Sequence, residues 1–132
     1  MGQVLIVDDD ATLRGLLRSI LEEEGYRVSE AVEGHAALDL LRRSPARFVV
    51  LLDYLMPGAD GKRVLQVVSQ DSFLSTRHAY ILLTARRRLS LPMDVARLLS
   101  LPVVRKPFDL EDLLVKVADA QKRLEVGGSG SS

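Results

Sequence analysis

The chain has no cysteine among its 132 residues. Disulfides and thiolate zinc sites are therefore excluded, which suits a reducing cytoplasm. Net charge is also lacking, because 18 lysines and arginines balance 18 aspartates and glutamates, so no overall field draws the chain toward nucleic acid or an anionic membrane. Apolar runs reach about five residues, far short of the ~20 that cross a bilayer. We therefore expect a cytoplasmic protein with no membrane span and no direct nucleic-acid contact.

The length and the 47% hydrophobic and 27% charged residues are typical of one globular domain. We predict that residues 1–125 form this domain. Residues 126–132, which end in "GGSGSS", are predicted to be a flexible linker or tag remnant. A stand-alone domain and a fragment of a longer protein both stay open.

Short apolar runs alternate with amphipathic segments along the domain. Apolar runs predict buried strands at 4–7, 48–52 and 80–83. A weaker, alternating pattern predicts a strand at 26–31, and a short edge strand is predicted at 102–105. Apolar residues at helical spacing predict helices around 13–21, 36–41, 64–68, 92–100 and 110–124. Strict alternation requires right-handed crossovers and a parallel sheet covered on both faces. The predicted fold is a doubly wound α/β sandwich with five strands and five helices.

Polar side chains follow four of the predicted strands, where ligands bind in open parallel sheets. They are Asp8, Asp9 and Asp10 after the first strand, Asp53 after the third, Thr84 after the fourth and Lys106 after the fifth. Carboxylates from two strands suit Mg²⁺, and a hydroxyl with an ammonium group suits phosphate oxygens. An acid directly after five apolar residues, such as Asp53, is costly to bury without a partner. The pattern indicates phosphoryl chemistry on a carboxylate nucleophile.

Four motifs in this order resemble the receiver domain of bacterial two-component response regulators, over about residues 2 to 124. They are the pair Asp8-Asp9, Asp53 within "DYLMPGADG", Thr84-Ala85 and Lys106-Pro107. The resemblance implies a flavodoxin-like, CheY-like fold with strand order 2-1-3-4-5. It also implies a cis peptide bond between Lys106 and Pro107.

The resemblance further implies the role of each site residue. Asp53 would be the phosphoacceptor, and Thr84 and Lys106 would contact the phosphoryl oxygens. Mg²⁺ would be bound by Asp9, by Asp53, by Asp8 through water, and by the main-chain carbonyl of Leu55. A histidine kinase or histidine phosphotransfer protein would donate the phosphoryl group, and the domain would then change its affinity for a partner or output. Such a domain catalyses only its own phosphorylation and dephosphorylation, so it is not an enzyme for an external substrate.

Two departures from the family concern the readout. Val103 stands where the family often has an aromatic residue that swings inward on phosphorylation. The region 86–102 is also atypical, although the face of the fourth and fifth helices is where an output domain or a second copy would bind. The cognate kinase, the stimulus and the output stay open.

Two other functions stay open from the residues alone. Asp8, Asp10 and Thr12 read as D-x-D-x-T, which resembles haloacid-dehalogenase-type phosphatases with Asp8 as nucleophile and Asp10 as general acid. Such enzymes need a further acidic motif and usually a cap insertion, and neither is evident. A receiver-like scaffold that works without phosphorylation is the other alternative. We expect Asp10 to be mainly the N-cap of the first helix.

The remaining candidates are less specific. His35 and His78 are predicted to be surface residues without a metal or phosphoacceptor role. The arginine run 86–88 is equally consistent with a docking patch and with a solvated loop.

Overall fold

The computed structural model describes residues 2–54, 61–84 and 101–129, with side chains as far as Val126. Outside the described residues lie the predicted helix at 92–100, the arginine run 86–88 and most of the turn after Asp53, including Leu55.

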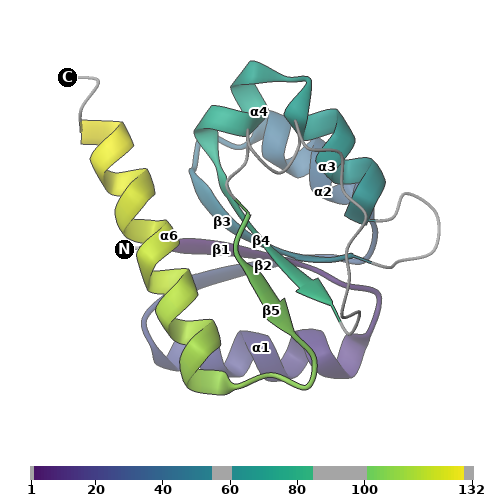
Figure 1. Cartoon of the computed structure of the whole chain (residues 1–132), viewed down its shortest axis with the longest axis vertical. Coiled ribbons are helices and arrows are strands. Elements are labelled where there is room, and N and C mark those ends of the chain that lie inside the picture. The colour runs from purple at the N-terminus through teal and green to yellow at the C-terminus, as the bar shows by residue number, and fades with distance from the viewer. Residues whose placement is uncertain (1, 55–60, 85–100, 130–132) are drawn as a thin grey trace.

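Five parallel strands form one sheet in the order β2-β1-β3-β4-β5 (Figure 1). They are β1 (Gln3–Val7), β2 (Arg27–Ala31), β3 (Phe48–Asp53), β4 (Ala79–Thr84) and β5 (Val103–Arg105). Each end of each strand lies within one residue of the position predicted from the sequence. The doubly wound fold and the strand order are confirmed.

Helices cover both faces of the sheet. They are α1 (Ala11–Glu23), α2 (Gly34–Arg43), α3 (Gly61–Ser69), α4 (Ser72–Arg77) and α6 (Leu110–Ser129). Helices α1 and α6 lie on one face, and α2, α3 and α4 lie on the other (Figure 1). Helix α6 continues into the segment predicted to be a linker. No helix in the described part of the chain is long and apolar enough to span a membrane.

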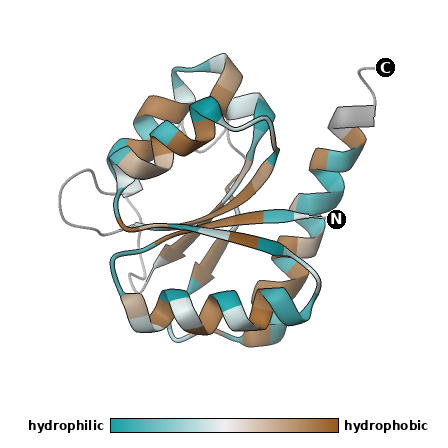
Figure 2. Cartoon of the chain, turned by 180° about the vertical axis from the view of Figure 1, so that it is seen from behind, coloured by the Kyte–Doolittle hydropathy of each residue, from teal (hydrophilic) through white to brown (hydrophobic). Residues whose placement is uncertain are grey.

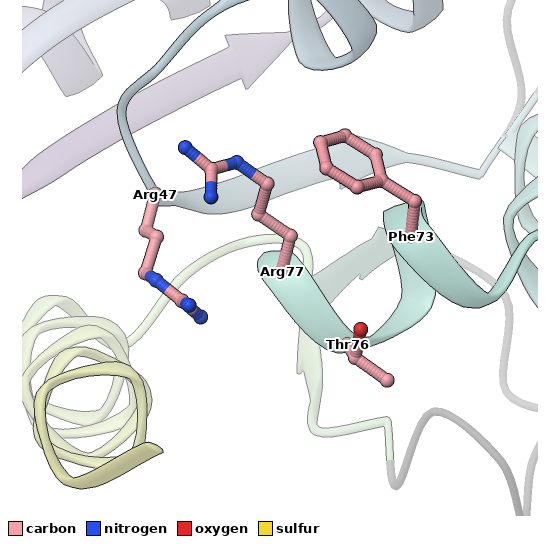
Figure 3. Close-up of a pocket in the computed structure, with 4 residues that line it drawn as sticks. All are labelled: Arg47, Phe73, Thr76 and Arg77. Atoms are coloured by element: carbon pink, nitrogen blue, oxygen red, sulfur yellow. The ribbon is translucent and has the colours of Figure 1, made fainter. Parts of the chain in front are cut away.

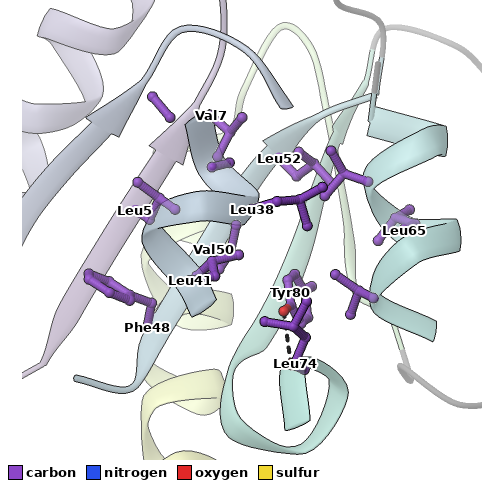
Figure 4. Packing of buried hydrophobic residues seen from close by; sticks show 14 of the residues in the cluster. Leu5, Val7, Leu38, Leu41, Phe48, Val50, Leu52, Leu65, Leu74 and Tyr80 are labelled. Carbon is purple, nitrogen blue, oxygen red and sulfur yellow. Dashed lines mark hydrogen bonds between the residues drawn. The ribbon is translucent and has the colours of Figure 1, made fainter. Parts of the chain in front are cut away.

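The sheet separates two hydrophobic cores, and alternate strand residues contribute to each. Leu5, Val50 and Leu52 pack under α2, α3 and α4 (Figure 4), whereas Val4 and Ile6 pack under α1 and α6. Apolar residues therefore face the sheet from both layers of helices (Figure 2). Burial of both strand faces explains the uninterrupted apolar runs in the sequence.

Local signals in the sequence mark the ends of two helices. Gly25 follows α1 with φ of 94°, a left-handed conformation that favours glycine. At the start of α6, the Asp109 carboxylate accepts a hydrogen bond from the Asp112 amide at 3.2 Å.

Helix α4 was not predicted. It has six residues, and Leu74 is its buried apolar residue, so no helical period can be read from the sequence. Its N-cap is Asp71, whose carboxylate accepts a hydrogen bond from the Leu74 amide at 3.1 Å.

The surface position predicted for His78 is wrong, although His35 is exposed as expected. The His78 residue is 3% exposed and joins three elements. Its Nδ1 accepts a hydrogen bond from the Phe48 amide at 3.0 Å, and its Nε2 lies 3.1 Å from the Leu41 carbonyl oxygen. This pairing requires the neutral imidazole with its proton on Nε2. Burial lowers the pKa of His78 to about 4.

We predict that His78 makes the fold sensitive to acid. Between pH 6.5 and about pH 4 the unfolded chain binds a proton at His78 that the folded chain does not. The free energy of unfolding should therefore fall by about 3 kcal/mol as pH is lowered through this window. Urea unfolding at stepped pH measures it.

The matched variants are His78→Gln and His35→Gln. The first should lose this component of the pH dependence, and the second should retain it, because His35 is exposed. The same pH profile in His78→Gln and the wild type would contradict the assignment.

Candidate functional site

The parallel register brings the predicted polar residues to one edge of the sheet. Val7 pairs with Leu52, so Asp8 and Asp53 leave neighbouring strands side by side. On the next strand, Leu83 pairs with Asp53, which places Thr84 one residue further along the same edge.

Three carboxylates converge at this edge. One carboxylate oxygen each from Asp8, Asp9 and Asp53 lies within 4.8 Å of the others. Asp8 and Asp53 are buried and Asp9 is exposed. Like charges at ~4 Å repel by roughly 4 kcal/mol per pair at an effective dielectric of about 20. The cluster therefore needs nearby positive charge.

Lys106 supplies positive charge to two of these acids. Its Nζ lies 3.3 Å from Asp8 Oδ2 and 3.6 Å from Asp53 Oδ1. The side chains of Asp8 and Asp53 are 1% and 11% exposed, whereas that of Lys106 is 27% exposed. Because the two acids are largely shielded from water, these ion pairs are screened less than surface pairs.

The polypeptide on either side of Lys106 is also fixed. Its amide donates a hydrogen bond to the carbonyl of buried Thr84 at 2.8 Å, which ties the end of β5 to the end of β4. The Lys106-Pro107 peptide bond is cis, as the resemblance implied. Thr84 and Lys106 therefore stand together at the edge that carries the acids.

Asp10 serves a different purpose from its two neighbours. Its Oδ1 accepts hydrogen bonds from the amides of Thr12 at 3.0 Å and Leu13 at 3.2 Å. This confirms Asp10 as the N-cap of α1, and its carboxylate is not part of the three-acid cluster.

Gly61 allows α3 to begin directly against the end of β3. A Cβ atom at this position would lie 2.4 Å from the Asp53 carbonyl oxygen and 2.7 Å from Tyr54 Cα. The Gly61 amide donates to the Tyr54 carbonyl at 3.1 Å. Because both close contacts are to backbone, a side chain here would displace the strand end that carries Asp53.

Sequence reasoning missed one residue at this edge. Arg14, at the end of the first turn of α1, donates from Nη1 to the Asp8 main-chain carbonyl at 2.8 Å. The signal available was an arginine shortly after the acidic run, but nothing in the sequence distinguishes it from a solvated helix residue.

A separate hollow of about 300 Å³ is lined by Arg47, Phe73, Thr76 and Arg77 (Figure 3). Arg47 and Arg77 precede β3 and β4, so this hollow lies at the opposite edge of the sheet from Asp53. The Arg77 guanidinium lies over the Phe73 ring at 5.5 Å and donates to the Pro45 carbonyl. These contacts fix the position of the Arg77 guanidinium in the hollow.

The fold and this edge define a class: doubly wound α/β proteins with an acidic cluster, a hydroxyl and a lysine at the carboxyl ends of parallel strands. The sequence profile of the response regulator receiver domain matches residues 4–118. The chain belongs to this family.

Individual proteins agree with the family assignment. The chain is 31% identical to sporulation initiation phosphotransferase F of Bacillus subtilis over 111 residues, which cover 84% of this chain and 86% of that protein. It is 34% identical to transcriptional regulatory protein CpxR of Escherichia coli over 128 residues, covering 93% of this chain but 50% of the regulator. The chain thus spans about half the length of that regulator.

The solved structures show the same fold. The CheY-like receiver domain protein of Methanospirillum hungatei superposes with a TM-score of 0.83 at 33% identity, covering 94% of this chain and 97% of that one. The family is a signalling family of two-component systems, which confirms the function class predicted from the sequence.

We predict that Gly61→Ala destabilises the protein by about 1–3 kcal/mol, because the added methyl group meets backbone atoms that cannot move without strain. Urea denaturation measures the change. The control is Gly15→Ala in the exposed middle of α1, where a Cβ meets nothing within 4 Å. That variant should gain up to about 1 kcal/mol from helix propensity. Equal effects of the two substitutions would contradict the packing argument.

We also predict that Lys106→Met lowers the free energy of unfolding by about 1–3 kcal/mol in chelated buffer, because buried carboxylates lose their cation. Lys116→Met is the control, since Lys116 pairs with Asp112 at 2.6 Å on the solvent side of α6 and this pair should contribute at most about 0.5 kcal/mol. An unchanged stability of the Lys106 variant would show that the acids do not depend on this lysine.

Proposed function

We propose that Asp53 is the phosphoacceptor of this receiver domain, and that Asp8, Asp9, Thr84 and Lys106 complete the site. The observation that carries the proposal is the convergence of three carboxylates within 4.8 Å around a lysine that contacts two of them. Thr84 on the adjacent strand supplies the hydroxyl that the same chemistry uses.

The accessibility of the acids favours Asp53 over Asp8 as nucleophile. Asp8 Oδ1 accepts a hydrogen bond from the Asp10 amide at 2.9 Å, and Asp8 Oδ2 contacts Lys106 at 3.3 Å. Both oxygens of a side chain that is 1% exposed are therefore engaged. Asp53 is more accessible and lies on β3, in the middle of the sheet.

In the proposed reaction, a carboxylate oxygen of Asp53 attacks the phosphorus of a phosphohistidine. A new O–P bond forms, the N–P bond breaks, and the imidazole leaves with the electron pair of that bond. Lys106 Nζ, already beside Asp53, stabilises negative charge on the phosphoryl oxygens, and the Thr84 hydroxyl donates a hydrogen bond to one of them. The product is an acyl phosphate on Asp53.

The donor set fits Mg²⁺, which prefers a few carboxylates together with water and phosphate oxygens. We propose that Asp9 and Asp53 bind it directly, Asp8 through water, and the Leu55 carbonyl as a further ligand. Leu55 lies outside the described residues. When bound, the ion neutralises charge on the phosphoryl group.

The partners follow from the family. We propose a histidine kinase or histidine phosphotransfer protein as donor, because the relatives include a phosphotransferase and a transcriptional regulator. An output domain or a second copy would contact the face that includes α6, where Leu110 and Val115 are exposed. We propose no external substrate for catalysis, no direct contact with nucleic acid or membrane, and a cytoplasmic location. The domain would comprise residues 1–125, followed by a linker.

We predict that the protein, incubated with Mg²⁺ and acetyl phosphate, acquires one phosphoryl group on Asp53. Trapping the acyl phosphate with borohydride and mapping the peptides locates it. Label on Asp8 would instead support the phosphatase alternative, and absence of label would support a scaffold.

Two asparagine variants sharpen the result. Asp53→Asn should abolish labelling. Asp10→Asn changes an acid of the same run that caps α1, and asparagine is itself a good N-cap, so this variant should label like the wild type. Equal loss of label in both would contradict the assignment of Asp53.

A further inference from the structure

Arg14 connects the loop that carries two of the acids to the neighbouring strand β2. Its Nη1 donates to the Asp8 carbonyl at 2.8 Å, and its Nε donates to Glu30 Oε1 at 2.9 Å. The two hydrogen bonds use different nitrogens of one planar guanidinium, so each constrains the direction of the other. The Arg14 side chain is 15% exposed, although it lies near the start of a surface helix.

The carbonyl that accepts from Arg14 belongs to the peptide unit joining Asp8 to Asp9. Because this unit is planar, a hydrogen bond that fixes its oxygen also fixes the direction in which the chain enters Asp9. Within the same turn, Asp8 Oδ1 accepts a hydrogen bond from the Asp10 amide. The short turn between β1 and α1 is thus held from within by Asp8 and from outside by Arg14.

Glu30 holds Arg14 in this geometry. It accepts from Arg14 Nε through Oε1, and its Oε2 lies 2.9 Å from Arg18 Nη1. Glu30 also compensates the positive charge of Arg14 close to the acids. Arg18 also pairs with Glu30, but it donates a hydrogen bond to the Val28 carbonyl instead of to the Asp8 carbonyl. Val28 pairs with Val4 in the sheet, four residues before Asp8. Arg18 is therefore a suitable control, because it lies on the same helix as Arg14 and pairs with the same Glu30 carboxylate, whereas its hydrogen bond goes to Val28 and not to Asp8.

We propose that Arg14 is a positioning residue for the metal site, anchored by Glu30, and that it orients the Asp8-Asp9 peptide for binding Mg²⁺. The inference rests on the proposed function and adds to it a residue that touches neither the ion nor the phosphoryl group. Groups that orient metal ligands typically change metal affinity by 10–100-fold when they are removed.

The experiment measures the Mg²⁺ dissociation constant of each folded variant from backbone amide NMR shifts. The substitutions keep charge, so that long-range electrostatics stay constant: Arg14→Lys, Glu30→Asp and, as control, Arg18→Lys. A single lysine amine cannot reproduce two bonds from separate nitrogens of a guanidinium. We expect Arg14→Lys and Glu30→Asp to raise the dissociation constant about tenfold. Arg18→Lys should stay within about twofold of the wild type.

Urea unfolding of the same variants separates positioning from stability. A purely structural role would lower the stability of Arg14→Lys while its Mg²⁺ affinity stayed at the wild-type value, and that result overturns the inference. The inference is also overturned if Arg18→Lys weakens Mg²⁺ binding as much as Arg14→Lys does. Glu30→Asp tests the same anchor if Arg14→Lys does not fold.

The wild type distinguishes this inference from the proposed function. A wild type that binds Mg²⁺ and labels on Asp53, with an unaffected Arg14→Lys, refutes only the role of Arg14. A wild type that shows no saturable Mg²⁺ shifts refutes the metal site itself, and with it the need for a positioning residue.

Discussion

Three carboxylates at one edge of a sheet repel one another, and the rest of the site is arranged around that repulsion. Lys106 lies 98 residues from Asp8 in the chain, yet its ammonium group contacts both Asp8 and Asp53. This places an electrostatic constraint on the sheet, because β5 must end close enough to the ends of β3 and β1 for the Lys106 side chain to reach both acids. In the observed strand order, β4 lies between β5 and β3, and the Thr84 carbonyl at the end of β4 accepts a hydrogen bond from the Lys106 amide.

The apolar interior makes this arrangement rigid. Burial of both faces of β1 and β3 fixes the strand register, since a slip of one residue would exchange the two cores and move every polar residue at the edge. Locally, Gly61 lets α3 start against the Asp53 carbonyl, and Asp10 caps α1 directly after the two acids. The site is therefore held by packing and backbone hydrogen bonds rather than by its own mutually repelling groups.

The sequence predicted the strands well because each strand is a short segment that ends at a polar residue. That residue lies beyond the hydrophobic cores, at the carboxyl end of the strand. It predicted the cluster because parallel strands bring their carboxyl ends together, although the strand order itself came from the family resemblance. It failed where burial depends on distant partners. His78 is buried through contacts with Phe48 and Leu41, 30 and 37 residues away, and Arg14 binds Glu30 across 16 residues. No local pattern marks such residues.

The position of Lys106 also bears on how a change at Asp53 can reach other parts of the domain. The Lys106 side chain contacts Asp8 and Asp53, and the Lys106 main-chain amide donates a hydrogen bond to the Thr84 carbonyl. A phosphoryl group on Asp53 would place new negative charge beside the Lys106 ammonium group, and the main chain of this lysine is hydrogen-bonded to the end of β4. Val103, the residue that replaces the family's usual aromatic, packs instead with the core under α2, α3 and α4. Without an aromatic ring at Val103, the Lys106 ion pairs with Asp8 and Asp53 connect the acidic cluster to the end of β5 in the described part of the chain, and the Lys106 amide joins the same residue to the end of β4.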